Sequence, residues 1–215
     1  MYAPTSETTP KRHPERARFD AETVHALLDE ALVGHLAFVA DGAPQVLPLL
    51  FVRDGAAVYL HASTGTRPAR ILARHGALDV AFEVTLVDEL VLARAAFSHS
   101  ANYRCVVAHG SLRLIGDAAR KAAVLDLLVD KIVPGRSADA RRPDESELRQ
   151  TAVMELALDA VSAKVRAGDP LDTERDLSSP VFAGRLPLLT RRGPPIPAAD
   201  LDPAIPVPAY LDPPS

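Results

Sequence analysis

The sequence has little cysteine, no tryptophan and no large excess of charge of either sign. Only one of the 215 residues, Cys105, is a cysteine, so the chain cannot form an internal disulfide or a zinc site built from several cysteines. Its 24 Lys and Arg residues against 28 Asp and Glu residues give a formal charge of −4, which provides no general attraction for nucleic acid or anionic membranes. We therefore expect a cytoplasmic protein that binds neither nucleic acid nor membrane.

A long apolar run is also missing from the N-terminal region. Residues 1–18 are polar and basic, and they lack the apolar stretch that a signal peptide or a membrane span needs. We interpret 1–18 as a flexible N-terminal arm. Hydrophobic residues make up 47% of the chain, which is enough for one substantial core in the remaining sequence.

Hydrophobic spacing predicts two helices and a three-strand meander in the first third of the chain. Asp20 is a suitable N-cap for a helix, which we expect to end at Gly34. Asp-Gly dipeptides, which favour tight turns, separate the three apolar segments that follow. The expected strands span 35–40, 45–52 and 57–62. A short helix over 68–75 and another strand over 78–84 come next.

The later sequence continues the β pattern around one long helix. A strand is expected over 103–114, with Gly110 as a bulge or a point of close approach. The following helix spans 118–132. Mixed charges without periodicity predict a solvated loop over 136–149, and alternating residues predict that 151–158 closes the sheet.

The strand over 57–62 runs into a turn rich in small hydroxyl residues and arginine. Such side chains, together with the first amides of a helix, are suited to binding phosphate. Arg67 and Arg70 would add charge-assisted hydrogen bonds. Neither a Walker loop nor a Gly-x-Gly-x-x-Gly fingerprint is present. From the local sequence alone, a capped helix with two surface arginines is an equal alternative.

The histidines do not form a metal-binding pattern. His25, His75 and His99 have no second histidine or paired carboxylate at a metal-ligand spacing, so we expect no protein-built metal site. His35 and His109 lie on apolar strands, where a structural imidazole is the commoner case.

Several short segments, taken in order, resemble a known family. They are 33–37, 48–51, 59–63, 82–83, 102–107 with 110, 162–166 and 180–184. Their order is similar to that of the pyridoxamine 5′-phosphate oxidase-like FMN-binding split barrels, and within them to the nitroimidazole-resistance (Nim-type) branch. The resemblance covers about 20–210. It implies a mainly β fold, a six-stranded antiparallel split barrel with flanking helices, and a homodimer with FMN at the subunit interface.

The resemblance also implies roles for individual residues. The segment 48–51 would line the isoalloxazine through its backbone, and 61–63 would continue that wall. Thr64, Arg67 and Arg70 would contact the phosphate. The segment 103–105 would come from the second subunit. The implied FMN contacts are Pro48, Leu49, Leu50, Phe51, His61, Ala62, Ser63, Thr64, Arg67, Arg70, Tyr103, Arg104 and Cys105.

Two residues depart from the family pattern. Cys105 stands where related sequences usually have Ser, and we interpret it as a buried, inert thiol rather than a flavin contact. Phe182 stands where the family often has Trp. It lies in a proline-rich C-terminal arm, 169–215, which is too apolar for a solvated linker and which we expect to pack on the barrel or on the dimer partner.

The implied function of the domain over 19–168 is electron or hydride transfer through FMN. NAD(P)H would be the donor, and a small nitro or quinone-like compound the acceptor. His61 is the candidate catalytic proton donor, with a merely structural histidine as the equal alternative. Two other functions stay open: a non-catalytic flavin-binding or sensing protein, and a haem-binding relative that uses a histidine in a similar barrel.

Overall fold

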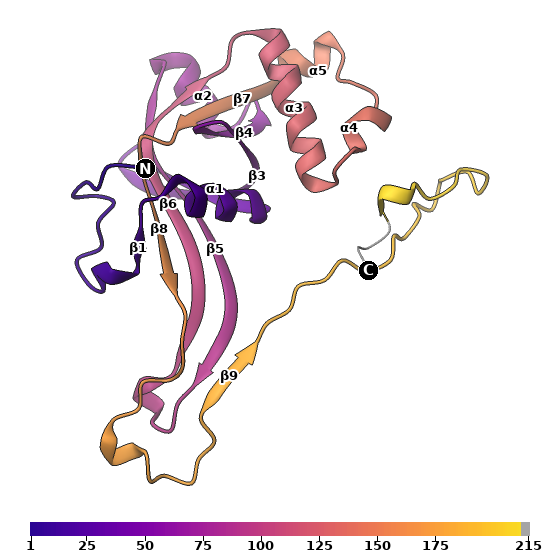
Figure 1. The fold of residues 1–215 in the computed structure, drawn as a ribbon. Coiled ribbons are helices and arrows are strands. Elements are labelled where there is room, and N and C mark those ends of the chain that lie inside the picture. The colour runs from indigo at the N-terminus through magenta and orange to yellow at the C-terminus, as the bar shows by residue number, and fades with distance from the viewer. Residues whose placement is uncertain (212–215) are drawn as a thin grey trace.

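The computed structural model describes residues 1–211, which form one antiparallel sheet with helices on its outside (Figure 1). The strands are β1 Ala17–Arg18, β2 Val33–Ala40, β3 Ala43–Asp54, β4 Ala57–Ser63, β5 Leu78–Leu92, β6 Ser100–Leu114, β7 Thr151–Ala157, β8 Ala160–Arg166 and β9 Gly184–Pro187. The α-helices are α1 Ala21–Glu30, α2 Arg67–His75, α3 Ala118–Ile132, α4 Arg136–Asp139 and α5 Glu145–Gln150.

Six of the strands close on themselves as a barrel. β6, β7, β4, β3, β2 and β5 are successive neighbours in the sheet, and β5 pairs back with β6. Each of these pairings is antiparallel. The predicted six-stranded antiparallel split barrel is therefore confirmed. Within the described residues, β1 and β8 extend the sheet beyond β6, and β9 extends it beyond β5.

Two apolar clusters hold the helices on the barrel. Inside the barrel, the buried rings of Phe51 and Phe82 pack edge to face with their centroids 5.0 Å apart. A smaller cluster joins α3 to the outer side of β3, β4 and β7. Val124 and Leu128 of α3 are buried there against Val52 and Tyr59. α3 is thus fixed beside the strands that lead to the candidate site.

The first helix begins at the predicted cap but ends earlier than predicted. The amide of Thr23 donates to the Asp20 carboxylate at 2.7 Å, and α1 ends at Glu30. Gly34, expected to end the helix, lies in β2 instead. A Cβ at Gly34 would lie 2.1 Å from the ring of Phe82, so this position must be glycine for the ring to pack against the strand.

β5 and β6 are both 15 residues long and continue past the barrel as a curved ribbon (Figure 1). The predicted strand over 78–84 was therefore too short. The carboxylates of Asp88 and Glu89 interrupt the apolar pattern there, but both remain in the strand with partners. Asp88 binds Arg104, and Glu89 accepts a hydrogen bond from Asn102. The register of β5 and β6 shifts between Val87 and Glu89.

Of three predictions for the second half of the chain, one was wrong and two were confirmed in part. The expected loop over 136–149 contains α4 and α5, whose four and six residues are too few to show a helical period. β7 pairs with both β4 and β6 and so closes the barrel as predicted, although β8 follows it and extends the sheet beyond β6. Gly110 is a point of close approach, since a Cβ there would lie 3.0 Å from Leu156, and the pairing shows no register shift at this position.

The N-terminal segment expected to be a flexible arm makes definite contacts with the sheet. The Tyr2 amide donates to the Phe19 carbonyl at 2.7 Å, and the Ser162 hydroxyl donates to the Thr8 carbonyl at 2.7 Å. β1 pairs with β8. The segment 1–18 therefore contributes to one edge of the sheet.

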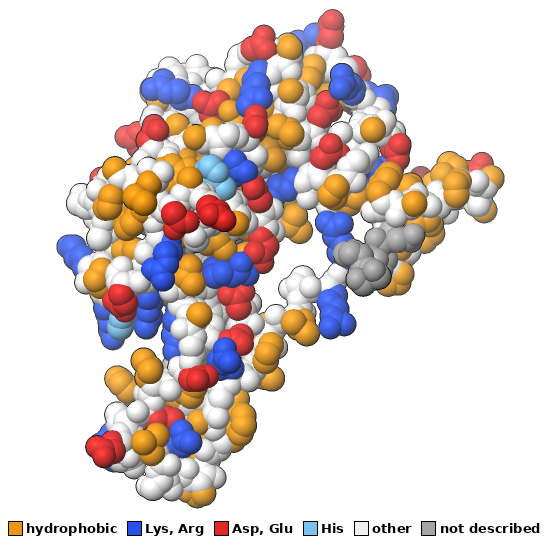
Figure 2. Space-filling view, in the orientation of Figure 1, with side chains coloured by type: hydrophobic (Ala, Val, Ile, Leu, Met, Phe, Trp, Pro, Cys, Tyr) orange, Lys and Arg blue, Asp and Glu red, His pale blue; other side chains and the backbone are white. Residues whose placement is uncertain are grey.

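The C-terminal arm pairs through β9 with β5 and then leaves the barrel (Figure 1). Hydrophobic side chains follow much of its course in Figure 2. Leu189 is 73% exposed and Ile196 is 92% exposed in this single chain. Packing of the arm on a dimer partner stays a prediction. No helix in the described part of the chain is long and apolar enough to cross a membrane.

Candidate functional site

His61 lies in a hollow between the barrel and α3. β3 and β4 pair with Phe51 opposite Leu60, and the residues next to this pair, Leu50 and His61, both line the hollow. Its volume is about 380 Å³. The remaining lining comes from α3 and the segment after it: Leu125, Leu128, Val129, Ile132, Arg141, Pro143 and Glu147. The wall is mainly apolar, with the imidazole at one side.

The imidazole of His61 has one nitrogen without a hydrogen-bond partner. Its Nδ1 is buried, and no donor or acceptor among the described residues reaches it. Burial lowers the pKa of His61 below its usual value, so the imidazole is neutral at neutral pH. A buried polar nitrogen without a partner is costly. The site is therefore suited to a ligand that hydrogen-bonds or coordinates this side chain.

A second hollow of about 380 Å³ lies at the start of α2. Its lining includes Gly65, Arg67 and Arg70, and also Asp41 from the turn between β2 and β3. Arg67 forms an ion pair with Asp41 and remains 47% exposed. The positive charge of the arginines and of the helix N-terminus suits this hollow to an anion.

The turn between β4 and α2 is organised by its own hydroxyl groups. The Gly65 amide donates to the Ser63 hydroxyl at 3.3 Å, and the Thr66 hydroxyl donates to the Ser63 carbonyl at 2.8 Å. Thr66 is the N-cap of α2, yet its side chain makes no capping bond. The first amides of α2 are therefore not satisfied by the usual side-chain cap.

The segment 48–51, predicted to line the isoalloxazine, has an exposed face and a buried face. Pro48 and Leu50 are exposed on the outer face of β3, whereas Leu49 packs against the barrel core. Phe51 is 1% exposed, and Lys131 Nζ lies 3.6 Å from its ring centroid. Its side chain belongs to the core, so any ligand contact by Phe51 has to use the backbone.

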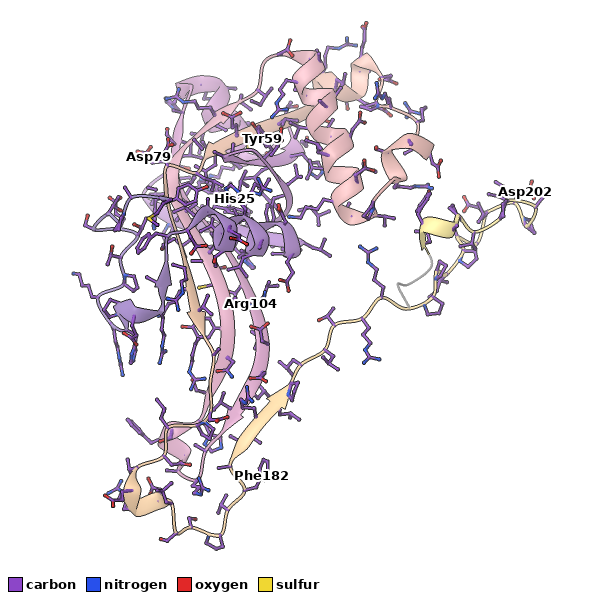
Figure 3. All side chains as sticks on the ribbon, viewed as in Figure 1. His25, Tyr59, Asp79, Arg104, Phe182 and Asp202 are labelled. Atoms are coloured by element: carbon purple, nitrogen blue, oxygen red, sulfur yellow. The ribbon has the colours of Figure 1, made fainter. Side chains whose placement is uncertain are left out.

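Tyr103, Arg104 and Cys105 lie on β6, and they line neither hollow of the single chain. Arg104 lies on the ribbon below α1 (Figure 3), where it binds Asp88 and Glu30. These carboxylates raise the pKa of Arg104. Burial raises the pKa of the Cys105 thiol, which is therefore neutral at neutral pH. Their predicted role in the site of a second subunit stays a prediction.

Comparison with known proteins places the fold. A family model described as pyridoxamine 5′-phosphate oxidase matches residues 20–165. The chain belongs to this family. No curated protein matches it.

Two solved structures are similar to this pyridoxamine 5′-phosphate oxidase family member over nearly its whole length. The flavocytochrome Anf3 from Azotobacter vinelandii is 37% identical, with a TM-score of 0.90 and coverage of 98% of this chain and 97% of Anf3. An FAD and haem binding protein from Mycobacterium smegmatis is 33% identical, with a TM-score of 0.85 and coverage of 91% and 95%.

The Nim-type likeness expected from the sequence is also found. A proposed 5-nitroimidazole antibiotic resistance protein from Bacteroides thetaiotaomicron has a TM-score of 0.58, with coverage of 69% of this chain and 86% of that protein. At 19% identity this similarity supports the shared fold alone.

Sequence reasoning missed one wall of the His61 hollow in this family member. Arg141 and Glu147 form an ion pair at 2.7 Å on its rim, in the segment expected to be a solvated loop. Asp144 and Glu147 form a capping box that begins α5. The Asp-x-x-Glu spacing could have revealed this helix start. Its position beside His61 could not have been found without the fold.

Proposed function

We propose that this chain binds a flavin nucleotide, with FMN as the first candidate, and uses it as an oxidoreductase. One observation carries the proposal: β4 carries His61 of the apolar hollow and runs through a short turn into α2, whose first residue, Arg67, lines the cationic hollow. A flavin nucleotide has matching parts, since a flat ring with polar edges is connected to a phosphate. The segment from His61 to Arg70 thus offers a partner to each part of the ligand.

The proposed reaction takes electrons from NAD(P)H to a small nitro or quinone-like acceptor in the cytoplasm. Bound flavin supplies the hydride and electron chemistry, while the protein orients the reactants. The apolar lining from α3 favours a flat, uncharged acceptor. His61 lies where it can hydrogen-bond or protonate that acceptor. The closest functional alternative is a protein that binds the same flavin without turning over a substrate.

The two similar proteins support a bound flavin, and they make FAD a candidate beside FMN. One is described as a flavocytochrome and the other as an FAD and haem binding protein. FAD contains the same ring and the same first phosphate as FMN, so the two hollows offer the same partners to either flavin. The choice between FMN and FAD is therefore part of the test.

We further propose that the active form is a homodimer joined through the outer face of β2 and β3. In this pairing Val33 lies opposite Leu50 and Val39 lies opposite Pro44. Val39 is 62% exposed and Val46 is 60% exposed, which is unusual for apolar strand residues of a single chain. A second copy on this face would cover them.

Haem is a second candidate ligand, and His61 is the observation on this chain that favours it. A haem iron takes a neutral imidazole as axial ligand, and burial keeps His61 neutral. The apolar lining of its hollow also suits a porphyrin edge. The similar protein described as FAD and haem binding adds support, as does the one described as a flavocytochrome.

Spectroscopy of the purified full-length protein tests these proposals. A flavin gives two absorption bands, one in the near ultraviolet and one in the blue, whereas a haem gives an intense Soret band. Mass analysis of the heat-released ligand separates FMN from FAD, and anaerobic addition of NAD(P)H followed by a quinone separates reductase from binder. Protein that contains neither flavin nor haem, and binds neither when they are added, would refute the proposed function.

The variant His61→Gln separates the two roles of this residue. Loss of a Soret band with retention of flavin would assign His61 to haem. Retention of both ligands with slower oxidation of the reduced flavin would assign it to the acceptor. Sedimentation of wild-type protein provides the dimer test, since flavin bound tightly by a 23.0 kDa monomer would rule out a site shared between subunits.

A further inference from the structure

A third hollow, of about 340 Å³, lies where the N-terminal segment meets the end of β8. Three arginines line it: Arg16, Arg18 and Arg166. Val165 and Leu171 provide apolar lining beside them. Lys and Arg side chains gather over the N-terminal segment at the left edge of Figure 2. The flavin contacts proposed above do not include any of these three arginines.

Arg166 is a buried cation without a carboxylate partner. Arg166 is only 8% exposed, and within residues 1–211 no Asp or Glu forms an ion pair with it. Its Nη1 donates to the Asn102 side-chain carbonyl. The Asn102 amide group in turn donates to Glu89 and to the Gly168 carbonyl. A buried guanidinium that has only a neutral direct partner is strongly stabilised by an anion.

The two other arginines are also largely free of carboxylates. Arg18 Nη1 donates at 2.8 Å to the backbone carbonyls of Glu15 and Ala17. Arg16 has only the Glu15 carboxylate, at 3.8 Å, where the attraction is weak.

The acidic residues at the hollow have other partners of their own. Glu15 lies 3.0 Å from His13, and Asp169 lies 3.1 Å from Arg185. The hollow consequently keeps an excess of positive charge from its three guanidinium groups.

We propose that this hollow binds the phosphate group of a nucleotide. Guanidinium groups bind phosphate oxygens in pairs and also stack on flat rings, and the apolar side chains of Val165 and Leu171 would cover a base or ribose. Arg166 pairs with Tyr103 across β8 and β6, so the hollow borders the strand expected to reach a flavin. The nucleotide is either the ADP half of a bound dinucleotide or a free nicotinamide dinucleotide. The first of these two occupants rests on the proposed flavin function, whereas the second does not.

Calorimetric titration of the full-length protein with ADP, adenosine and inorganic phosphate tests the site. ADP should bind, adenosine should not, and phosphate should bind more weakly than ADP. Arg16→Ala/Arg18→Ala should weaken ADP binding at least tenfold, and Arg166→Lys, which keeps the charge but loses the fork, should weaken it several-fold. Arg12→Ala is the matched control, because it removes one charge from the same segment outside the hollow. Its affinity should stay within twofold of wild type.

A second measurement identifies the source of the nucleotide. If the protein is purified with FAD, the ADP half occupies the hollow, and the double variant should lose FAD on dialysis faster than wild type while retaining added FMN. If it is purified without FAD, NADPH and ADP should compete for the same site. The proposal is overturned if the double variant matches wild type in both ADP affinity and FAD retention, with unchanged melting temperatures. Equal binding of inorganic phosphate by wild type and double variant would also overturn it.

Discussion

Replacement of Arg67 by alanine is the sharpest test of the proposed phosphate site. A charge-assisted hydrogen bond contributes about 1.5 to 3 kcal/mol. In the free protein Arg67 forms an exposed ion pair with Asp41, and breaking such a pair costs about 0 to 1 kcal/mol. The net loss for FMN should therefore be about 0.5 to 3 kcal/mol, which corresponds to a roughly two- to 140-fold weaker affinity. Riboflavin, which has no phosphate, should bind the variant and the wild type equally.

Fluorescence quenching of FMN and riboflavin by protein stripped of ligand measures both affinities. Asp41→Asn is the matched control, because it releases Arg67 from its ion pair and should strengthen FMN binding. The two variants should shift the affinity for FMN in opposite directions and leave the affinity for riboflavin unchanged. Equal losses of FMN and riboflavin in Arg67→Ala would refute a phosphate contact and would indicate a general disturbance of the fold.

Three further predictions concern other parts of the chain. Because burial lowers the pKa of His61, the folded state binds fewer protons there than the unfolded state, so stability should fall as the pH drops below about 6.5, the unperturbed value. The free energy of unfolding, measured as the pH is lowered, should fall less in His61→Gln than in wild type. The same pH dependence in both proteins would contradict the burial argument. Gly34→Ala should destabilise the fold by about 1 to 3 kcal/mol in urea, because the new methyl group meets Phe82, whereas Gly116→Ala, which meets nothing within 4 Å, should not. Equal midpoints for these two variants would contradict the close packing. Truncation after Asp176 removes β9 from the edge of β5, so it should lower the melting temperature or the retention of flavin, and a shortened protein that keeps both would show the arm to be dispensable.

The barrel could be predicted from the sequence because its signals are local. Asp-Gly turns separate the strands of the meander, and apolar alternation marks the strand over 151–157. Positions that depend on contacts far apart in the chain were predicted less well. Gly34 has the sequence context of a helix end, and only the ring of Phe82 explains its place in β2. Asp88 breaks an apolar pattern, and only Arg104 on the neighbouring strand explains why β5 continues.

The part of the candidate site that is formed by residues close together in the sequence could be predicted. His61 and Arg67 are six positions apart, and the strand, turn and helix between them were each signalled by residue type. The α3 wall and the Arg141 rim of the His61 hollow come from segments more than sixty residues later. Their approach depends on how β7 pairs with β4, which a local pattern does not specify.

The three β6 residues implied by the family resemblance are not equivalent in this chain. Arg104 donates through Nε and both terminal nitrogens to Asp88 and Glu30, so little of its hydrogen-bonding capacity is left for a ligand. Cys105 is a half-buried neutral thiol, which is a weak hydrogen-bonding group. Tyr103 makes no side-chain hydrogen bond within the described residues and pairs in register with Arg166. If a second copy supplies β6 to the flavin, Tyr103 is therefore the side chain of the three that is free to contact it, and Arg104 serves to hold α1 against the ribbon.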